Sequence, residues 1–238
     1  MPSPQKQSSI HAAHVEHGAV MAHKDGWVMP ERYTGLNDEA SRVQRGVGLI
    51  DRSDIIKIDL KSSTLQTWIK QTFDADIKAQ EACRDITADG TVRICCSMRV
   101  DWGLMIVPTS HTAERVDTLM EQTHGELHMT DASSVYTALQ LVGPRCLDVL
   151  QKLTSLDLRP SLMSNLTCKQ GTIAKVPGLM LRDDLAAYPS YWIFITREYG
   201  EFVWETICDV GKACDLIPIG YETYRYLTTN NSNYGDPS

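Results

Sequence analysis

The stretch that decides the fold reads His17-Gly-Ala-Val-Met21, then Gly26-Trp27-Val-Met29-Pro30-Glu-Arg-Tyr33, then Arg45-Gly-Val-Gly-Leu-Ile-Asp51-Arg-Ser53. Around it the residue pattern predicts a helix over 9–23, an irregular loop at 26–30 and a second helix over 37–46, capped by Asn37 or Asp38. The run 55–60 has the composition and partial alternation of a strand. Asp54 therefore stands at the start of a predicted strand.

The rest of the chain mixes helices with strands joined by short turns. The predicted helices cover 64–73, 112–123, 145–153 and 199–214, with a short segment at 221–227. The predicted strands cover 91–100, 104–107, 135–142, 172–176, 179–182 and 191–196, and turns are indicated at Asp89-Gly90 and Pro177-Gly178. Because hairpins connect strands as often as helices do, the pattern predicts an α+β fold and disfavours a doubly wound parallel sheet.

Composition excludes several classes of protein. The chain has 238 residues, 42% hydrophobic and 22% charged, which is ordinary for a soluble globular protein. Its formal net charge of -7 argues against a nucleic-acid partner. We expect no membrane span, because no apolar run approaches about 18 residues. The polar N-terminus does not resemble a secretory signal, so a cytoplasmic location is expected.

Seven cysteines are scattered along the chain, and none forms a C-x-x-C pair. An odd, irregularly spaced set does not indicate a disulfide framework. We expect most of them to be buried thiols of a reduced protein.

Read in order, the opening motifs resemble the aminomethyltransferase (glycine-cleavage T-protein) family of folate-binding proteins. Three later stretches are similar to the same family in the same order: Leu141-Val-Gly-Pro144, Tyr191-Trp-Ile-Phe-Ile-Thr196 followed by Trp204, and Pro218-Ile-Gly220 followed by Tyr224-Arg225. The resemblance implies two intertwined α/β subdomains with antiparallel sheets flanked by helices, over 9–132 and 133–227. It also implies a short form in which the family's third, β-barrel domain is absent. From their own composition, residues 1–8 are predicted to be a disordered lead and residues 228–238 a polar tail.

The resemblance further implies an activity. It points to a tetrahydrofolate-dependent methyltransferase or demethylase, or a subunit of one, with tetrahydrofolate and a small methylated substrate as ligands. The gamma subunit of heterotetrameric sarcosine oxidase is a short relative of this kind, so a partner polypeptide could supply the missing domain. The alternative is a non-catalytic accessory or scaffold subunit of the same fold. A binding protein for another flat ligand is a third possibility.

The chain departs from the family where the chemistry is usually done. Cys96 stands where the resemblance places the catalytic Asp, Pro108 where it places an Asn, and Tyr188 where it places the Glu that holds the pterin ring. Glycine-cleavage activity is therefore not expected, whereas demethylation of another substrate stays open.

Six residues are candidates for the site. Tyr33 and Asp54 are the proposed catalytic groups, since each could exchange a proton with a substrate heteroatom. Cys96, Tyr188, Trp192 and Arg225 are the proposed cofactor-binding groups, with the aromatic rings stacking on a flat ligand and Arg225 pairing with a carboxylate. For each there is an ordinary alternative, namely core packing for the aromatic residues, a solvent-facing carboxylate for Asp54 and an exposed salt bridge for Arg225.

Two motifs suggest other chemistry only weakly. His11, His14 and His17 recur every third residue, but the rings spread around a helix and no acidic or thiol cluster completes a metal site, so a solvated helix face is favoured and no metal is expected. Cys95 and Cys96 are adjacent on a predicted strand, so their thiols point to opposite faces and burial is favoured over a redox pair.

Overall fold

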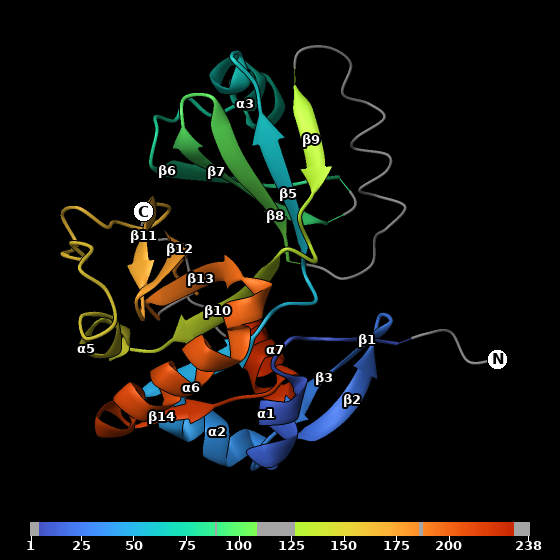
Figure 1. Cartoon of the computed structure of the whole chain (residues 1–238), viewed down its shortest axis with the longest axis vertical. Coiled ribbons are helices and arrows are strands. Elements are labelled where there is room, and N and C mark those ends of the chain that lie inside the picture. Colours follow the sequence, from blue (N-terminus) through green and yellow to red (C-terminus); the bar gives the residue numbers. More distant parts are fainter. Residues whose placement is uncertain (1–4, 89, 109–126, 186–187, 231–238) are drawn as a thin grey trace.

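The computed structural model describes residues 5–88, 90–108, 127–185 and 188–230. The predicted helix over 112–123, most of the predicted tail and Asp89 of the predicted turn lie outside these residues. Figure 1 shows the chain with its elements labelled.

Three sheets organise the chain (Figure 1). The three-stranded sheet has the order β1-β3-β2 and consists of β1 (Lys6–Gln7), β3 (Trp27–Arg32) and β2 (Val20–Lys24). The six-stranded sheet has the order β11-β12-β13-β10-β4-β14 and consists of β11 (Cys168–Ile173), β12 (Val176–Arg182), β13 (Ser190–Thr196), β10 (Tyr136–Val142), β4 (Val47–Asp51) and β14 (Leu216–Pro218). The five-stranded sheet has the order β6-β7-β8-β5-β9 and consists of β6 (Glu81–Ile86), β7 (Val92–Arg99), β8 (Trp102–Val107), β5 (Ile56–Lys61) and β9 (His128–Asp131).

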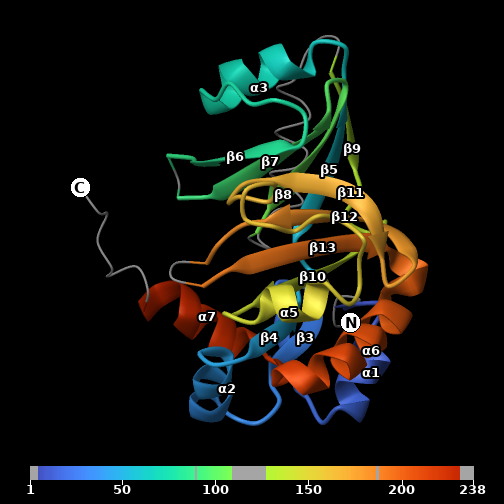
Figure 2. The same cartoon turned by 90° about the vertical axis from the view of Figure 1, so that its left-hand side faces the viewer.

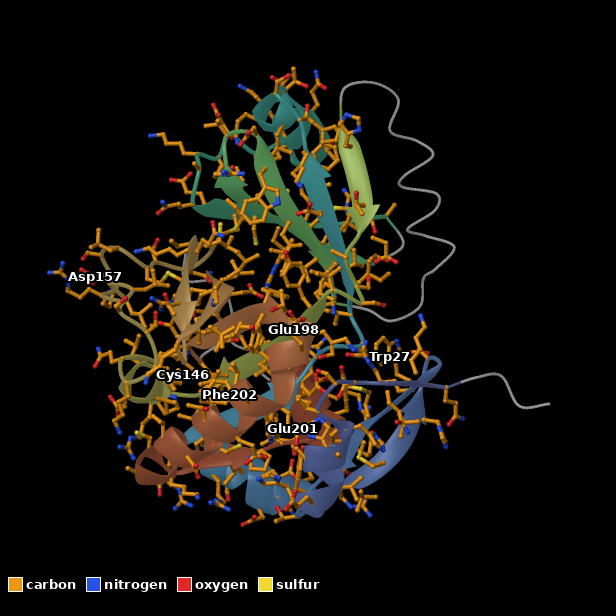
Figure 3. The ribbon with its side chains drawn as sticks, viewed as in Figure 1. Trp27, Cys146, Asp157, Glu198, Glu201 and Phe202 are labelled. Atoms are coloured by element: carbon orange, nitrogen blue, oxygen red, sulfur yellow. The ribbon has the colours of Figure 1, made fainter. Side chains whose placement is uncertain are left out.

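Helices pack on both faces of the six-stranded sheet and on the outer face of the five-stranded sheet. They are α1 (His11–Glu16), α2 (Leu36–Val43), α3 (Leu65–Phe73), α5 (Cys146–Leu150), α6 (Gly200–Gly211) and α7 (Tyr221–Asn230), with 3-10 turns η1 (Arg197–Tyr199) and η2 (Lys212–Cys214). Figure 2 shows the five-stranded sheet and α3 above the six-stranded sheet, with α1 and α6 below it. Figure 3 adds the side chains to the view of Figure 1 and labels Glu201 and Phe202 on α6.

The alternation of side chains along the strands builds the layers. In β13, Ile193 packs with α5 and α6 in one core cluster, whereas Trp192 and Phe194 pack with the five-stranded sheet in another. The other face of the five-stranded sheet buries Ile58 and Cys95 against α3. Successive residues of a strand point to opposite faces, so the side chains of this one strand pack into two different core clusters. The predicted α+β class, with mostly antiparallel sheets flanked by helices, is confirmed.

Strand pairing crosses the predicted subdomain boundary. β4, which precedes residue 132, pairs antiparallel with β10 and parallel with β14, which both follow it. The exact boundary between 132 and 133 stays a prediction.

Several predicted elements were placed wrongly. The helix predicted over 9–23 ends at Glu16, because Gly18 has a φ of +78° and the chain then enters β2. The segment 26–30, predicted as a loop, lies in β3, the middle strand of its sheet. Residues 6–7, predicted to be disordered, pair with β3 as β1. The turn between β11 and β12 falls at Ala174 and Lys175, both with positive φ, and Pro177-Gly178 lies inside β12.

Candidate functional site

Strands of the three-stranded and six-stranded sheets, together with α7, converge on the segment Arg52–Asp54 that joins β4 to β5. The side chains that meet there are polar or aromatic and come from β2, β10, β13 and α7: Lys24, Gln140, Trp192, Tyr221 and Tyr224. We call these residues, with Arg52 and Asp54, the central cluster. Arg52 and Asp54 are 2% and 4% exposed, so the cluster is an interior feature of the fold.

The guanidinium of Arg52 lies in the middle of the cluster. Its Nε donates to Tyr221 Oη at 3.0 Å, and its Nη2 donates to the backbone carbonyl of Pro108 at 2.9 Å. Its centre lies 4.2 Å from the ring of Tyr224 and 5.1 Å from the ring of Trp192. A planar cation over aromatic faces is a favourable arrangement, and more so away from water.

The chemistry of arginine sets the direction of the hydrogen bonds. A guanidinium only donates, so Tyr221 Oη accepts from Arg52 and its own proton goes to Asp54 Oδ1. The other oxygen, Oδ2, accepts from Lys24 Nζ at 2.8 Å. Burial, and then the Asp54 carboxylate, raise the pKa of Tyr221 well above its usual value, which keeps the phenol protonated. Asp54 is thus a buried carboxylate whose two oxygens already have donors.

A second polar network lies on the other side of Ser53. His14 Nε2 lies 3.0 Å from Asp51 Oδ2, and Tyr33 Oη lies 2.8 Å from His14 Nδ1. Burial by itself would raise the pKa of Asp51, but hydrogen bonds from His14 and Ser53 outweigh it and lower that pKa. Because an ionised Asp51 only accepts, His14 Nε2 carries a proton and the ring is oriented toward Tyr33.

Lys57 is buried between these two networks. Its Nζ donates to the carbonyl of Ser53 at 2.9 Å, and Asp54 and then Asp51 are the acidic residues that favour its charged form most strongly. Burial lowers the pKa of Lys57 to about 8, although the two carboxylates oppose that change.

The structure brings some of the predicted residues together and separates others. Asp54 and Trp192 belong to the central cluster, and Tyr188 packs beside Tyr224 in the same core cluster. Tyr33 belongs to the His14–Asp51 network, and no hydrogen bond among the described residues joins it to Asp54.

The other two candidates lie away from the cluster's polar atoms. Cys96 is buried in the apolar core with Trp192, and the hydrogen bond that its thiol gives to Cys168, followed by burial, raises its pKa. Arg225 is exposed and pairs with Glu31, so the ordinary alternative of a surface salt bridge describes it.

The structure also tests the predictions for the three N-terminal histidines and for the adjacent Cys95 and Cys96. A solvated helix face was wrong for His14, which is fully buried. Among the described residues no group of His, Cys, Asp or Glu is placed to hold a metal ion. Cys95 and Cys96 lie in different core clusters, as predicted for neighbours on a strand.

No helix in the described part of the chain is long and apolar enough to cross a bilayer.

Five members of the central cluster were missed from the sequence: Lys24, Arg52, Gln140, Tyr221 and Tyr224. A signal existed for two of them. Arg52 directly follows the fully buried strand β4, and Gln140 interrupts an otherwise apolar strand, both unusual places for polar side chains. Lys24, Tyr221 and Tyr224 carried no such signal, because only the tertiary fold brings β2 and α7 to Asp54.

The cluster does not fit a bound pterin ring by itself. The faces of Trp192 and Tyr224, where a flat ring would stack, are covered by Arg52. Both oxygens of Asp54, which would bind the N–H edge of such a ring, have internal donors. The buried polar atoms without a partner in the described residues belong to His11, Tyr191 and Trp204, none of them in the cluster.

Comparison with known proteins places this fold in a family. The profile described as GCVT N-terminal domain matches residues 10–232. The chain belongs to the GCVT N-terminal domain family. Its curated relatives include aminomethyltransferases of Desulfitobacterium hafniense (26% identical, 90% of this chain and 61% of the relative) and Acidobacterium capsulatum (27% identical, 92% and 61%). This GCVT-family chain therefore spans about 61% of the length of those relatives.

Solved structures agree at the level of the fold. The glycine cleavage system aminomethyltransferase T of Bartonella henselae superimposes with a TM-score of 0.79 at 15% identity, over 94% of this chain and 62% of that one. A chain of the heterotetrameric sarcosine oxidase from Corynebacterium sp. U-96 gives a TM-score of 0.60 at 19% identity, over 76% of this chain and 92% of that one. At these identities the similarity shows that the GCVT-family chain has the aminomethyltransferase fold.

Proposed function

We propose that this chain is a subunit of a folate-dependent one-carbon transfer system, a demethylase or methyltransferase, and that it provides the residues facing the methylated substrate. The observation that carries the proposal is that β2 and α7 bring Lys24 and Tyr221 onto the buried carboxylate of Asp54. A buried carboxylate held by oriented donors is the kind of group that exchanges a proton with a substrate nitrogen, oxygen or sulfur. Family membership supports the reaction class.

The folate itself would be held with help from a partner chain. Two observations support this: a chain of the heterotetrameric sarcosine oxidase has this fold, and the central cluster of this chain does not fit a pterin ring by itself. Tetrahydrofolate would supply the acceptor for the methyl group. The residues of this chain would bind and orient the substrate, and Asp54 would accept or return its proton.

Lys24, like Tyr224, is a partly exposed member of the cluster. Its side chain is 25% exposed, while that of Asp54 is fully covered. We infer that a substrate approaches Asp54 from the Lys24 side. We also infer a cytoplasmic location, which is supported by seven free cysteines, since such thiols persist in a reducing compartment.

The first test compares tetrahydrofolate binding by the isolated chain with binding by its native complex. The chain is purified alone and, from the organism that encodes it, as the native complex, and each is titrated with tetrahydrofolate by calorimetry. The proposal expects saturable binding by the complex and none at micromolar concentration by the chain alone. The native complex is then supplied with N-, O- and S-methylated small molecules, and tetrahydrofolate-dependent loss of the methyl group is measured.

Variants connect the activity to this chain. Replacing Asp54 with Asn should lower the rate at least tenfold, because the amide cannot take the proton, while Asp209→Asn at an exposed position should leave it unchanged. A native complex without any tetrahydrofolate-dependent activity would contradict the proposal.

The alternative, a non-catalytic accessory subunit, is favoured by one observation. Arg52 covers the aromatic faces, and the polar groups of the cluster satisfy one another. If the complex is active and Asp54→Asn leaves that activity unchanged, the accessory function is the correct one.

A further inference from the structure

A groove lies at the end of β5 that is remote from the central cluster, and most of its charged lining residues are basic. Its volume is about 460 Å³, within the range of small-molecule sites, and it opens to solvent. It is lined by the end of β5, the start of α3, the β7–β8 hairpin and the start of β9, through Lys61, Ser62, Ser63, Arg99, Asp101, Trp102 and His128. Figure 1 shows these elements meeting at the top of the five-stranded sheet, away from α7.

Strand register aligns the main groups of this groove. Arg99 is paired with Trp102, Trp102 with Lys61, and Lys61 with His128, across the adjacent strands β7, β8, β5 and β9. Residues directly opposite each other in antiparallel strands share a face of the sheet. Four strands at their usual spacing make this basic row about 14 Å long.

Trp102 is held in place within the basic row. Its indole Nε1 donates to Asp59, and the guanidinium of Arg99 lies 5.4 Å from its ring. The register between β7 and β8 shifts between Ser97 and Arg99. Such bulges re-aim a side chain and occur often beside functional sites.

The cationic side chains of the groove are exposed to solvent and are only weakly paired with carboxylates. Lys61 and Arg99 are both 65% exposed, and their contacts with Asp59 and Asp101 are long, at 3.5 and 3.7 Å. Exposed pairs of this length contribute little, so a ligand can compete for both cations. The chain as a whole carries a net charge of -7, so a row of Arg, Lys and His with one lining carboxylate is a local exception.

We propose that the basic row binds a small aromatic anion, whose flat ring displaces the exposed guanidinium of Arg99 from the ring of Trp102 and whose phosphate or carboxylate is then held by Lys61 and Arg99. The ring supplies stacking and the charged group supplies charge-assisted hydrogen bonds, while His128 provides a further polar contact. The site is independent of the central cluster and of the proposed one-carbon function.

Calorimetry with two pairs of probes tests the proposal and identifies the source of the anion. Adenosine monophosphate is compared with adenosine, and benzoate with benzamide, at low salt. We expect the anion of at least one pair to bind and its neutral analogue to bind at least about fivefold more weakly, a difference of roughly 1 kcal/mol. The pair that responds shows whether phosphate or carboxylate is recognised.

Matched variants locate the binding. Arg99→Gln and Lys61→Gln should each weaken binding about fivefold. Arg159→Gln is the control, because Arg159 is also exposed and also pairs with an aspartate two residues away. Failure of both anions to bind at millimolar concentration would overturn the proposal, as would equal weakening by Arg159→Gln. Circular dichroism establishes that each variant is folded.

Discussion

Lys57 keeps an amino group in the interior, where burial lowers its pKa to about 8 from the usual 10.5. Between these two values the unfolded chain binds a proton that the folded chain does not, so stability should rise with pH in that window. Below pH 8 Lys57 is protonated in both the folded and the unfolded chain. The buried charge then lowers the free energy of unfolding by its full amount, roughly 3 kcal/mol at most.

Lys57→Met should therefore stabilise the protein at pH 7, and its advantage should shrink as the pH approaches 10.5. Urea unfolding of both proteins at pH 7, 8, 9 and 10 measures this difference, and other titrating groups cancel in the comparison. A variant that is less stable at pH 7, by an amount independent of pH, would show that Asp54 and Asp51 fully compensate the charge.

Tyr221 links the two charged residues of the central cluster through one hydroxyl group. Phenylalanine at this position keeps the ring but leaves Arg52 Nε without this acceptor and removes a donor from Asp54. We expect a loss of about 2 kcal/mol in the free energy of unfolding, as for other hydrogen bonds to buried charged groups. Tyr199→Phe, at a 45% exposed side chain, should change it by less than about 0.5 kcal/mol. Equal losses in the two variants would mean that the hydroxyl of Tyr221 has no special role.

At the scale of single residues, the sequence identified chemistry only where a neighbouring pattern supported it. Asp54 and Trp192 were found because each occupies a recognisable position beside or within a strand. Arg52 was not recognised, because a charged residue after a buried strand is usually expected to turn toward solvent. Its burial depends on Pro108 and Tyr221, which are 56 and 169 positions away in the chain.

Among the elements, the start of α7 is held by a close approach to β3. A Cβ added to Gly220 would lie 2.1 Å from the carbonyl oxygen of Glu31, and the Gly220 N–H donates to the buried carboxylate of Glu39. Gly220→Ala should displace α7, and with it Tyr221, at a cost of about 3 kcal/mol. Chemical denaturation measures this cost.

The control for that variant is Gly35→Ala, where nothing lies within 4 Å of the added Cβ and the backbone is extended. Its effect should stay below about 1 kcal/mol, the usual range for an N-cap position. Similar losses for both variants would show that α7 moves away from β3 freely.

Elements were predictable where their pattern is local. The helix α3 and the strands β5 and β10 fall close to their predicted bounds, because each has its own periodicity and cap or turn. The strands β4 and β14 were missed, because a short strand buried on both faces shows no alternation. The β11–β12 turn was displaced because Ala174 and Lys175, which adopt positive φ there, are not typical turn residues.

At the scale of the whole molecule, the class and family could be predicted while the layering could not. The order of weak motifs along the chain indicated the aminomethyltransferase fold, but only long-range pairing places the two larger sheets face to face around Trp192 and Phe194. The central cluster lies where those layers meet the three-stranded sheet. The sequence alone therefore identified some of its residues but could not predict that they lie together.

The thiols provide a prediction for the molecule as a whole. All seven cysteines are free and buried, and Cys83 and Cys95 are directly opposite each other on neighbouring strands without being bonded. Alkylation in denaturant should therefore add seven labels with or without a prior reducing step, whereas the folded protein should react slowly at every site because access is blocked. A reducing agent should leave the midpoint of thermal unfolding unchanged, since no covalent link among the described residues restrains the unfolded chain. If fewer labels were added without reduction, a disulfide would exist in solution, and the inference of a reducing, cytoplasmic location would lose its support.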